Sequence, residues 1–216
     1  MRYFFASPRY SEDIDFDARG VDAARLESTV DEALASRPLS FILRTRSVKI
    51  AGITKPKQTR TTQRWKVVLA ADSSTGPVRT KVEFSHRQAD PRSQLDQVPP
   101  AVAEAYGLHP PIVRRYLPAA MIEQKISALA TRAETQARDM FDLDLLFTQW
   151  PKTMQPGAIN RELLDSAAER AMQLPYESFR SLVVRFLQTD VVELYDRPAA
   201  WERVQSHVVD MLMALR

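Results

Sequence analysis

The chain has 216 residues, of which 44% are hydrophobic and 26% charged, and its formal net charge is +3. These values are typical of a folded protein with one large or two small domains. No apolar run reaches the roughly 18 residues of a membrane helix, and the opening residues lack the apolar core of a secretory signal. The chain has no cysteine, which excludes disulfides, thiolate metal sites and cysteine nucleophiles. We therefore expect a cytoplasmic protein with no membrane partner.

Charge is distributed unevenly along the first third of the chain. Residues 1–32 carry eight acids and four arginines, whereas residues 33–71 carry nine bases and no acid. An acidic segment followed by a basic one indicates a cation or metal site beside an anion-binding surface. The alternative is that both segments are solvated faces of ordinary strands.

The first half of the chain is predicted to be rich in β-strands. In residues 13–17, three aspartates alternate with Ile14 and Phe16, which is the spacing of a strand. Apolar residues at helical spacing predict a helix over residues 21–36. Segments rich in β-branched and aromatic residues predict further strands over residues 39–50, 63–71 and 78–85, with turns at 55–58 and 72–77.

Residues 87–100 are polar and contain prolines, which predicts a loop or linker. One more short strand is predicted over residues 111–117. From Pro118 onward the pattern becomes helical. Helices are expected over residues 118–132, 137–150, 159–174, 176–188 and 199–216. We therefore predict an α+β protein with a β-rich domain over residues 1–112 and a helical domain over residues 113–216.

The acidic strand carries the clearest chemical signal. Asp13 and Asp15 project from one face of a strand, with Cβ atoms about 7 Å apart. Carboxylates this close repel each other unless a cation or a proton intervenes, and Mg²⁺ prefers such oxygen ligands. Glu83, between Val82 and Phe84 on another predicted strand, offers a third ligand of the kind used in two-metal phosphoryl transfer. Solvent-facing strands also produce this pattern, so a plain wet strand is the alternative.

Other phosphate chemistries have no support in the sequence. The five glycines, at positions 20, 52, 76, 107 and 157, are far apart. A P-loop and a dinucleotide-binding fingerprint both need clustered glycines that let the backbone approach phosphate. These two classes are therefore excluded.

Two segments together resemble a known family, the nucleotidyl transferase AbiEii/AbiGii toxin family. Residues 8–17, PRYSEDIDFD, are similar to its R-x-S-x-D-I-D strand element, and residues 121–147 are similar to its helical element that leads into R-D-x-x-D-L. The matching residues are Arg9, Ser11, Asp13, Asp15, Glu123, Lys125, Ala128, Leu129, Arg132, Arg138, Asp139 and Asp142. The resemblance covers roughly residues 1–148.

The resemblance implies a nucleotidyltransferase-like mixed sheet with flanking helices, followed by a helical C-terminal domain. It implies a toxin of a toxin–antitoxin system that uses Mg²⁺ and a nucleoside triphosphate (NTP). The acceptor would be an RNA, such as a tRNA 3′ end, or a protein, and a cognate antitoxin would be a partner.

The resemblance also assigns roles to individual residues. Asp13 and Asp15 would be catalytic and would hold the metal, while Arg9 and Ser11 would bind the nucleotide. Lys125 would be catalytic and would contact the nucleotide phosphates. Asp139 and Asp142 would support the site. The alternative for the helical element is that its charged residues form structural salt bridges.

Family members carry a glycine-rich element about a dozen residues before the first aspartate. Here no glycine precedes Gly20, and the chain begins 12 residues before Asp13. We therefore expect an N-terminus that is truncated relative to the family.

Three functional hypotheses follow. The first is a metal-dependent nucleotidyltransferase whose basic segment, Arg37 to Lys66, holds an RNA backbone, with Trp65 either stacking on a base or packing in the core. The second is a catalytically impaired protein of the same fold that binds RNA or a protein partner. The third is a basic nucleic-acid-binding protein whose acids are only solvated.

Overall fold

The computed structural model describes residues 1–73, 75–86 and 92–216. Its α+β class, with a mixed sheet and flanking helices, is the one predicted. The chain divides into two compact units: the sheet unit, Ser11–Ala89, and the helical unit, formed by Met1–Tyr10 with Asp90–Arg216. Residues 1–10 and 90–112 thus belong to the helical unit, whereas the predicted domain boundary at 112/113 places them with the strands.

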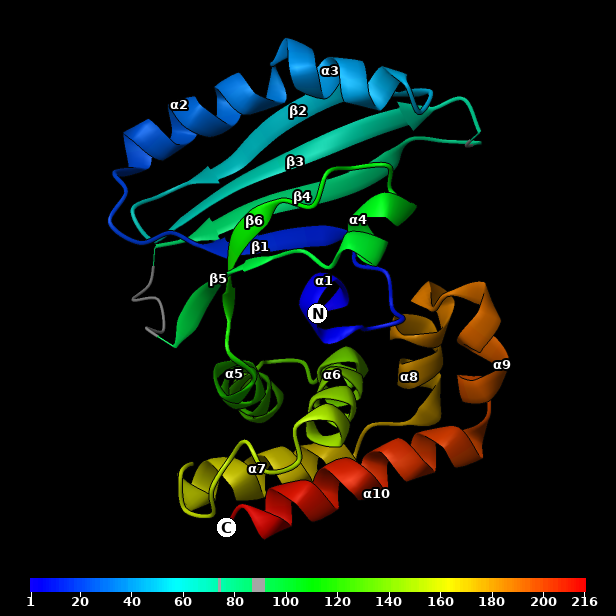
Figure 1. Ribbon diagram of the computed structural model, residues 1–216. Coiled ribbons are helices and arrows are strands. Elements are labelled where there is room, and N and C mark those ends of the chain that lie inside the picture. The colour runs from blue at the N-terminus through cyan, green and yellow to red at the C-terminus, as the bar shows by residue number, and fades with distance from the viewer. Residues whose placement is uncertain (74, 87–91) are drawn as a thin grey trace. The chain divides into compact units, whose positions relative to one another are not determined.

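The sheet unit contains one four-stranded mixed sheet (Figure 1). Its spatial order is β1 (Asp13–Asp17), β4 (Val78–Ser85), β3 (Thr62–Ala71) and β2 (Val48–Gln58). Strand β1 pairs parallel with β4, and the other two pairings are antiparallel. The predicted strands over residues 13–17, 63–71 and 78–85 are confirmed.

Helices α2 (Ala23–Leu34) and α3 (Arg37–Arg44) lie over one face of this sheet (Figure 1). Trp65, which is fully buried, lies beneath them and donates its indole Nε1–H to Asp31 Oδ1 at 2.8 Å. Phe84 meets the Trp65 ring edge-on, with centroids 5.8 Å apart. Trp65 is therefore a core residue, and the alternative of a stacking surface is wrong.

The predicted strand over residues 39–50 is wrong in its first part. Residues 39–44 belong to α3, whose N-cap Ser36 accepts a hydrogen bond from the Leu39 backbone N–H. Pro38 occupies the first turn, where its missing N–H costs nothing. These local capping signals outweigh the β-propensity of Phe41 and Ile42.

The predicted turn at residues 55–58 is also wrong, because β2 runs through it. The pairing of β2 with β3 shifts register between Thr54 and Lys57, which marks a bulge that contains Pro56. Strand β2 is an edge strand, and edge bulges are where a sheet tolerates proline.

The helical unit contains a small antiparallel hairpin of β5 (Ser93–Gln97) and β6 (Ile112–Tyr116), with α4 (Pro100–Ala105) between them. Strand β6 confirms the prediction for residues 111–117. The predicted loop over 87–100 is wrong for β5, and its residues 87–91 lie outside the described residues. The sequence of β5 is polar, and pairing with β6 orders it, with an ion pair between Asp96 and Arg115 at 2.8 Å.

Helices build the rest of this unit. They are α1 (Arg2–Phe5), α5 (Pro118–Thr131), α6 (Ala137–Gln149), α7 (Arg161–Met172), α8 (Tyr176–Leu182), α9 (Val192–Tyr195) and α10 (Pro198–Ala214), with short 3₁₀ turns at Val184–Phe186 and Thr189–Val191. Most predicted helices are confirmed. The helix predicted over 176–188 instead ends at Leu182, where Val183 leaves helical geometry.

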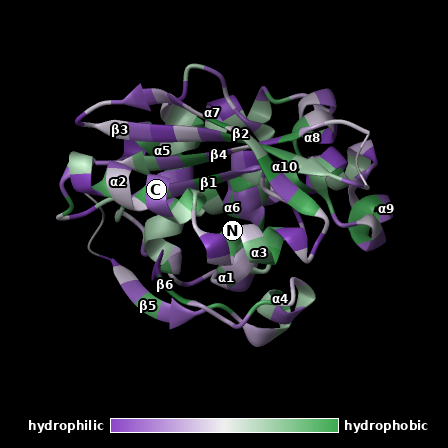
Figure 2. Cartoon of the chain, turned by 90° about the horizontal axis from the view of Figure 1, so that it is seen from above, coloured by the Kyte–Doolittle hydropathy of each residue, from purple (hydrophilic) through white to green (hydrophobic). Residues whose placement is uncertain are grey.

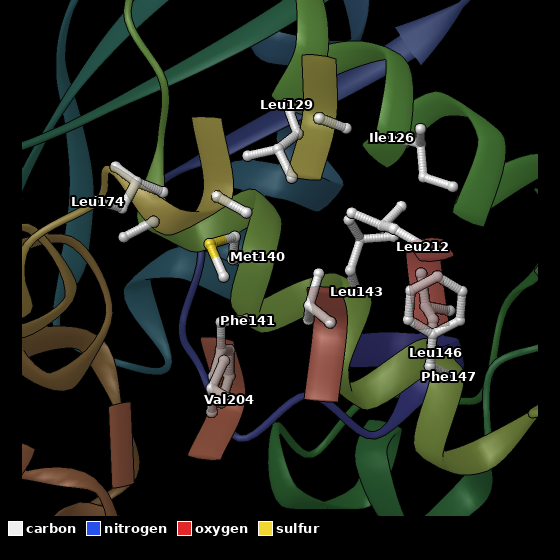
Figure 3. Packing of buried hydrophobic residues seen from close by; sticks show 14 of the residues in the cluster. Ile126, Leu129, Met140, Phe141, Leu143, Leu146, Phe147, Leu174, Val204 and Leu212 are labelled. Atoms are coloured by element: carbon white, nitrogen blue, oxygen red, sulfur yellow. The ribbon is translucent and has the colours of Figure 1, made fainter. Parts of the chain in front are cut away.

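The core of the helical unit is formed by α5, α6, α7 and α10. Met140, Phe141 and Leu143 from α6 are fully buried and lie against α5 and α10 side chains (Figure 3). Phe179 stacks on Trp201 with ring centroids 4.7 Å apart. Helix α10 buries Trp201, Val204, Val208 and Leu212, which share one side at helical spacing, as expected for a helix that covers a core. Figure 2 shows the hydropathy of each residue, with strand β5 largely hydrophilic.

Across the described ranges, no helix is both long enough and apolar enough to span a bilayer.

Candidate functional site

The acidic strand contributes to a charged cluster on the sheet. The parallel register places Asp13 beside Lys81 and Asp15 beside Glu83. Side chains of paired residues project to the same face, so all four lie together there. The Lys81 Nζ atom is 3.3 Å from Asp13 Oδ2, 3.4 Å from Asp15 Oδ1 and 3.8 Å from Glu83 Oε2. We call these four residues the carboxylate cluster.

Glu83 has a second cationic partner, Arg64 on β3. The two residues are register partners, and the Arg64 Nε–H donates to Glu83 Oε2. Partial burial opposes ionisation of Glu83, but the Arg64 hydrogen bond and the Lys81 charge outweigh it and lower the pKa of this carboxyl. Glu83 is therefore ionised and held from two sides.

The carboxylate cluster has the donor chemistry that Mg²⁺ requires. Its oxygens already converge on a cation, the Lys81 ammonium group. Over the parts of the chain that are described, no group of three or more histidine, cysteine, aspartate or glutamate side chains is arranged as a metal site. Mg²⁺ is commonly held by one or two carboxylates together with substrate phosphates, and Asp13 and Asp15 fit that arrangement. Glu83 as a third ligand stays a prediction, and its partners here are Arg64 and Lys81.

The two predicted nucleotide-binding residues before the strand make local contacts. The Ser11 hydroxyl donates to the Asp13 backbone carbonyl at 2.8 Å, which fixes the start of β1. Arg9 belongs to the helical unit, where its backbone forms a bridge with Leu187. Its Nε–H is buried and has no hydrogen-bond acceptor among the described atoms. Their nucleotide-binding roles stay predictions.

A second charged cluster lies inside the helical unit, between α5 and α6. The Lys125 Nζ atom is 2.9 Å from Asp139 Oδ1 and 2.6 Å from Asp142 Oδ2. Both aspartates are 0% exposed, and Arg132 Nε lies 3.2 Å from Asp139 Oδ2. The structure thus brings Lys125, Asp139 and Asp142 together, as their joint assignment to one site requires. We call these three residues the lysine lock.

Electrostatics keeps Lys125 protonated. Burial opposes the charge of Lys125, but the nearby charges of Asp142 and Asp139 outweigh it and raise the pKa of this lysine. Asp142 Oδ1 is buried and has no hydrogen-bond partner among the described residues. One ammonium group therefore serves two carboxylates, and it joins α5 to α6. The catalytic roles of these residues stay predictions.

Sequence reasoning missed Lys81 and Arg64. Lys81 stands two residues before Glu83 on one strand, so alternation alone places both on the same face. The Arg64 contact depends on the register of β3 with β4, which the sequence does not reveal. Part of the basic segment also pairs with the acidic one. Lys55 Nζ lies 2.5 Å from Glu27 Oε1 and 2.9 Å from Asp31 Oδ2.

A hollow of about 320 Å³ lies elsewhere, against α10 in the helical unit. It is lined by Met172, Glu202, Gln205, Ser206, Val209 and Asp210. None of the predicted site residues lines this hollow, so it is not part of the candidate site.

A mixed sheet with flanking helices and paired carboxylates on one strand defines a nucleotidyltransferase-like α+β protein. Two solved structures from Helicobacter pylori share this fold. JHP933 aligns with a TM-score of 0.56 and 19% identity, over 96% of this chain and 76% of its own. A "putative nucleotidyltransferase" aligns with a TM-score of 0.55 and 18% identity, over 96% of this chain and 82% of its own.

The family follows from the sequence. Residues 1–214 match the family described as "Nucleotidyl transferase AbiEii toxin, Type IV TA system", and the chain belongs to this family. The resemblance is thereby confirmed, and it extends beyond residue 148 to nearly the whole chain. No curated protein matches the sequence.

Replacing Lys125 by methionine should strongly destabilise the protein. The change leaves Asp139 and Asp142 buried without their shared cation, and removing one partner of a buried pair costs about 3 to 5 kcal/mol. Denaturant unfolding followed by circular dichroism measures this. Lys152→Met, at an exposed position of the same unit, is the control and should change stability by less than about 0.5 kcal/mol. Equal losses in the two variants would contradict the lysine lock.

The stabilisation by Lys125 should be lost at alkaline pH. A lysine with a raised pKa in the folded state stabilises fully below its ordinary value of 10.5, and this contribution disappears as the pH rises through the folded pKa. The difference in unfolding free energy between the wild type and Lys125→Met should therefore be constant near neutral pH and shrink above 10.5. Chemical denaturation across this range tests it, and a difference that shrinks below pH 9 or so would contradict the assignment.

Proposed function

We propose that this chain transfers a nucleotide from an NTP to an RNA acceptor, with Mg²⁺ held by Asp13 and Asp15. The single observation that carries the proposal is the convergence of these two carboxylates on a cation on one face of the sheet. Membership in a nucleotidyltransferase family supports it.

The proposed reaction is an in-line displacement at the α-phosphorus of the NTP. An acceptor hydroxyl oxygen bonds to that phosphorus, the bond to the bridging oxygen of the β-phosphate breaks, and pyrophosphate and the hydroxyl proton leave. Bound Mg²⁺ would neutralise charge that develops on the phosphate oxygens. Asp13 and Asp15 hold the cation, and the Ser11 hydroxyl fixes the backbone beside them.

Within the helical unit, Lys125 would bind phosphate groups through its positive charge, which Asp139 and Asp142 preserve. An ammonium group held from two sides keeps one orientation, and a preorganised charge stabilises a transition state without reorganising. Arg9 has a buried Nε–H that lacks an acceptor among the described atoms, and a phosphate oxygen would satisfy it.

The proposed RNA contact lies on α3 rather than at Trp65. Arg37, Phe41 and Arg44 follow one another at i, i+4 and i+7, so they form one stripe along this helix. Phe41 is 69% exposed. Neither arginine forms an ion pair with a carboxylate in the described parts of the chain. We call these three residues the α3 stripe.

Charge favours RNA over a protein acceptor for this surface. The segment of residues 33–71 has nine bases and no acid, and within the described ranges two of these bases, Lys55 and Arg64, form ion pairs. Unpaired arginines bind phosphates and release counterions, while an exposed aromatic ring provides a platform for an unpaired base.

Replacing Asp13 or Asp15 by asparagine should abolish transfer. Each change removes one negative charge from the proposed Mg²⁺ site, and we expect the rate of label transfer from radioactive NTPs to total tRNA to fall by about a hundredfold or more. Asp17→Asn, two positions further along the same strand face, is the matched control and should retain most of the activity. Transfer that survives in Asp13→Asn combined with Asp15→Asn would overturn the site.

The same experiment separates the alternative function. If the wild type transfers no label from any NTP but binds RNA, the chain is a binding protein of the nucleotidyltransferase fold. If it does neither, the RNA proposal fails as well.

Replacing Phe41 by alanine should weaken RNA binding. Loss of one base stack costs about 1 to 3 kcal/mol, or roughly 5- to 150-fold in affinity. Arg44→Ala should lower the slope of log affinity against log salt by about 0.7 to 0.9. Fluorescence anisotropy with labelled tRNA at several salt concentrations measures both.

Two control variants make the RNA measurement specific. Phe41→Trp preserves a stacking surface and should bind like the wild type. Tyr3→Ala removes another exposed aromatic side chain, in the helical unit, and should leave the affinity unchanged. Equal losses in Phe41→Ala and Tyr3→Ala would contradict the α3 stripe.

A further inference from the structure

Lys81 places an ammonium group among the oxygens of the carboxylate cluster. Its Nζ atom lies within 4 Å of oxygens from Asp13, Asp15 and Glu83. The Lys81 side chain is only 24% exposed, so it does not project freely into solvent. The sequence pattern alone assigns no role to Lys81.

We propose that Lys81 is a built-in counter-ion that competes with the divalent cation for Asp13 and Asp15. This inference rests on the proposed metal site. Before the metal binds, the ammonium group neutralises repulsion between the two aspartates and keeps them together. When the metal binds, the ammonium group must leave their oxygens.

Glu83 is the anchor that keeps Lys81 near the cluster. Its side chain is 22% exposed, and it is ionised because Arg64 donates to it from the neighbouring strand. Glu83 therefore attracts the ammonium group from β4, while Asp13 and Asp15 attract it from β1. On displacement from the aspartates, Lys81 can remain beside Glu83.

The charges determine how strongly Lys81 opposes metal binding. The carboxylate cluster together with Arg64 contains three carboxylates and two cationic side chains, so its formal net charge is −1. Without Lys81 the net charge is −2 and no competing cation is present. A divalent ion then meets a more negative site and displaces nothing, so its affinity must rise.

Exposure makes this exchange feasible. The side chains of Asp13 and Asp15 are 39% and 69% exposed, so water can solvate them as the ammonium group departs. Ion pairs this exposed contribute little net stability and can be broken without unfolding the sheet.

Direct metal titration of the full chain tests the inference. Mn²⁺ binding, followed by the electron paramagnetic resonance signal of the free ion, should be tighter by about tenfold in Lys81→Met than in the wild type. Calorimetry with Mg²⁺ should show the same direction. Lys81→Arg retains the positive charge and should bind close to the wild-type affinity.

The matched control is Lys66→Met. Lys66 is the register partner of Lys81 on β3 and projects from the same face, but it forms no ion pair with the carboxylates of the described chain. It changes the net charge by the same amount, so it reports the general electrostatic effect alone. Asp13→Asn added to Lys81→Met should remove the gain in affinity.

Several outcomes would overturn the inference. These are equal Mn²⁺ affinities in Lys81→Met and Lys66→Met, weaker binding in Lys81→Met than in the wild type, or no binding in any variant. Lys81→Gln provides a second test if the methionine variant does not fold. The titration needs neither NTP nor RNA. Increased metal affinity without label transfer therefore overturns only the proposed function, and label transfer with unchanged metal affinity overturns only the role of Lys81.

Discussion

The parallel pairing of β1 with β4 is the constraint on which the candidate site depends. It places Asp13 beside Lys81 and Asp15 beside Glu83. The alternating pleat then sends all four side chains to one face and sends Ile14, Phe16, Val82 and Phe84 to the other. A slip of β1 by one residue would turn Asp13 and Asp15 to the opposite face, away from Lys81 and Glu83. The stacking of Phe84 on Phe16 and its edge-on contact with Trp65 therefore help to hold the charged cluster in register from the opposite face.

The two units solve the problem of crowded carboxylates in different ways. In the sheet unit the carboxylates share the cationic partners Lys81 and Arg64, and they retain access to water. In the helical unit Asp139 and Asp142 are sealed from water, and Lys125 with Arg132 supplies the compensating charge. Carboxylates and basic side chains thus form a solvent-accessible cluster in the sheet unit and a buried cluster in the helical unit.

The sequence predicts well which face of a strand a side chain occupies, but it predicts poorly which residues of other strands that side chain contacts. Alternation identified Asp13, Asp15 and Glu83 as neighbours on one face, and the structure brings them together. It could not identify Arg64 as the partner of Glu83, because that contact depends on inter-strand register. The β propensity of residues 39–44 predicts a strand, but the N-cap at Ser36 begins a helix there. Strand β5 was missed because its order comes from β6 and from the ion pair of Asp96 with Arg115, which a local window does not contain.

Solvent access determines whether Lys81 or Lys125 can change its carboxylate partners. When Lys81 leaves Asp13 and Asp15, water or a metal ion can take its place, because those side chains are 39% and 69% exposed. When Lys125 leaves Asp139 and Asp142, water cannot take its place, because those side chains are at most 1% exposed, although Arg132 remains beside Asp139. An uncompensated charge in such a place costs several kcal/mol, roughly as much as many domains have to spare. Lys125 can therefore offer only a fixed charge to a ligand, whereas Lys81 can exchange its carboxylate partners for a new arrangement during binding.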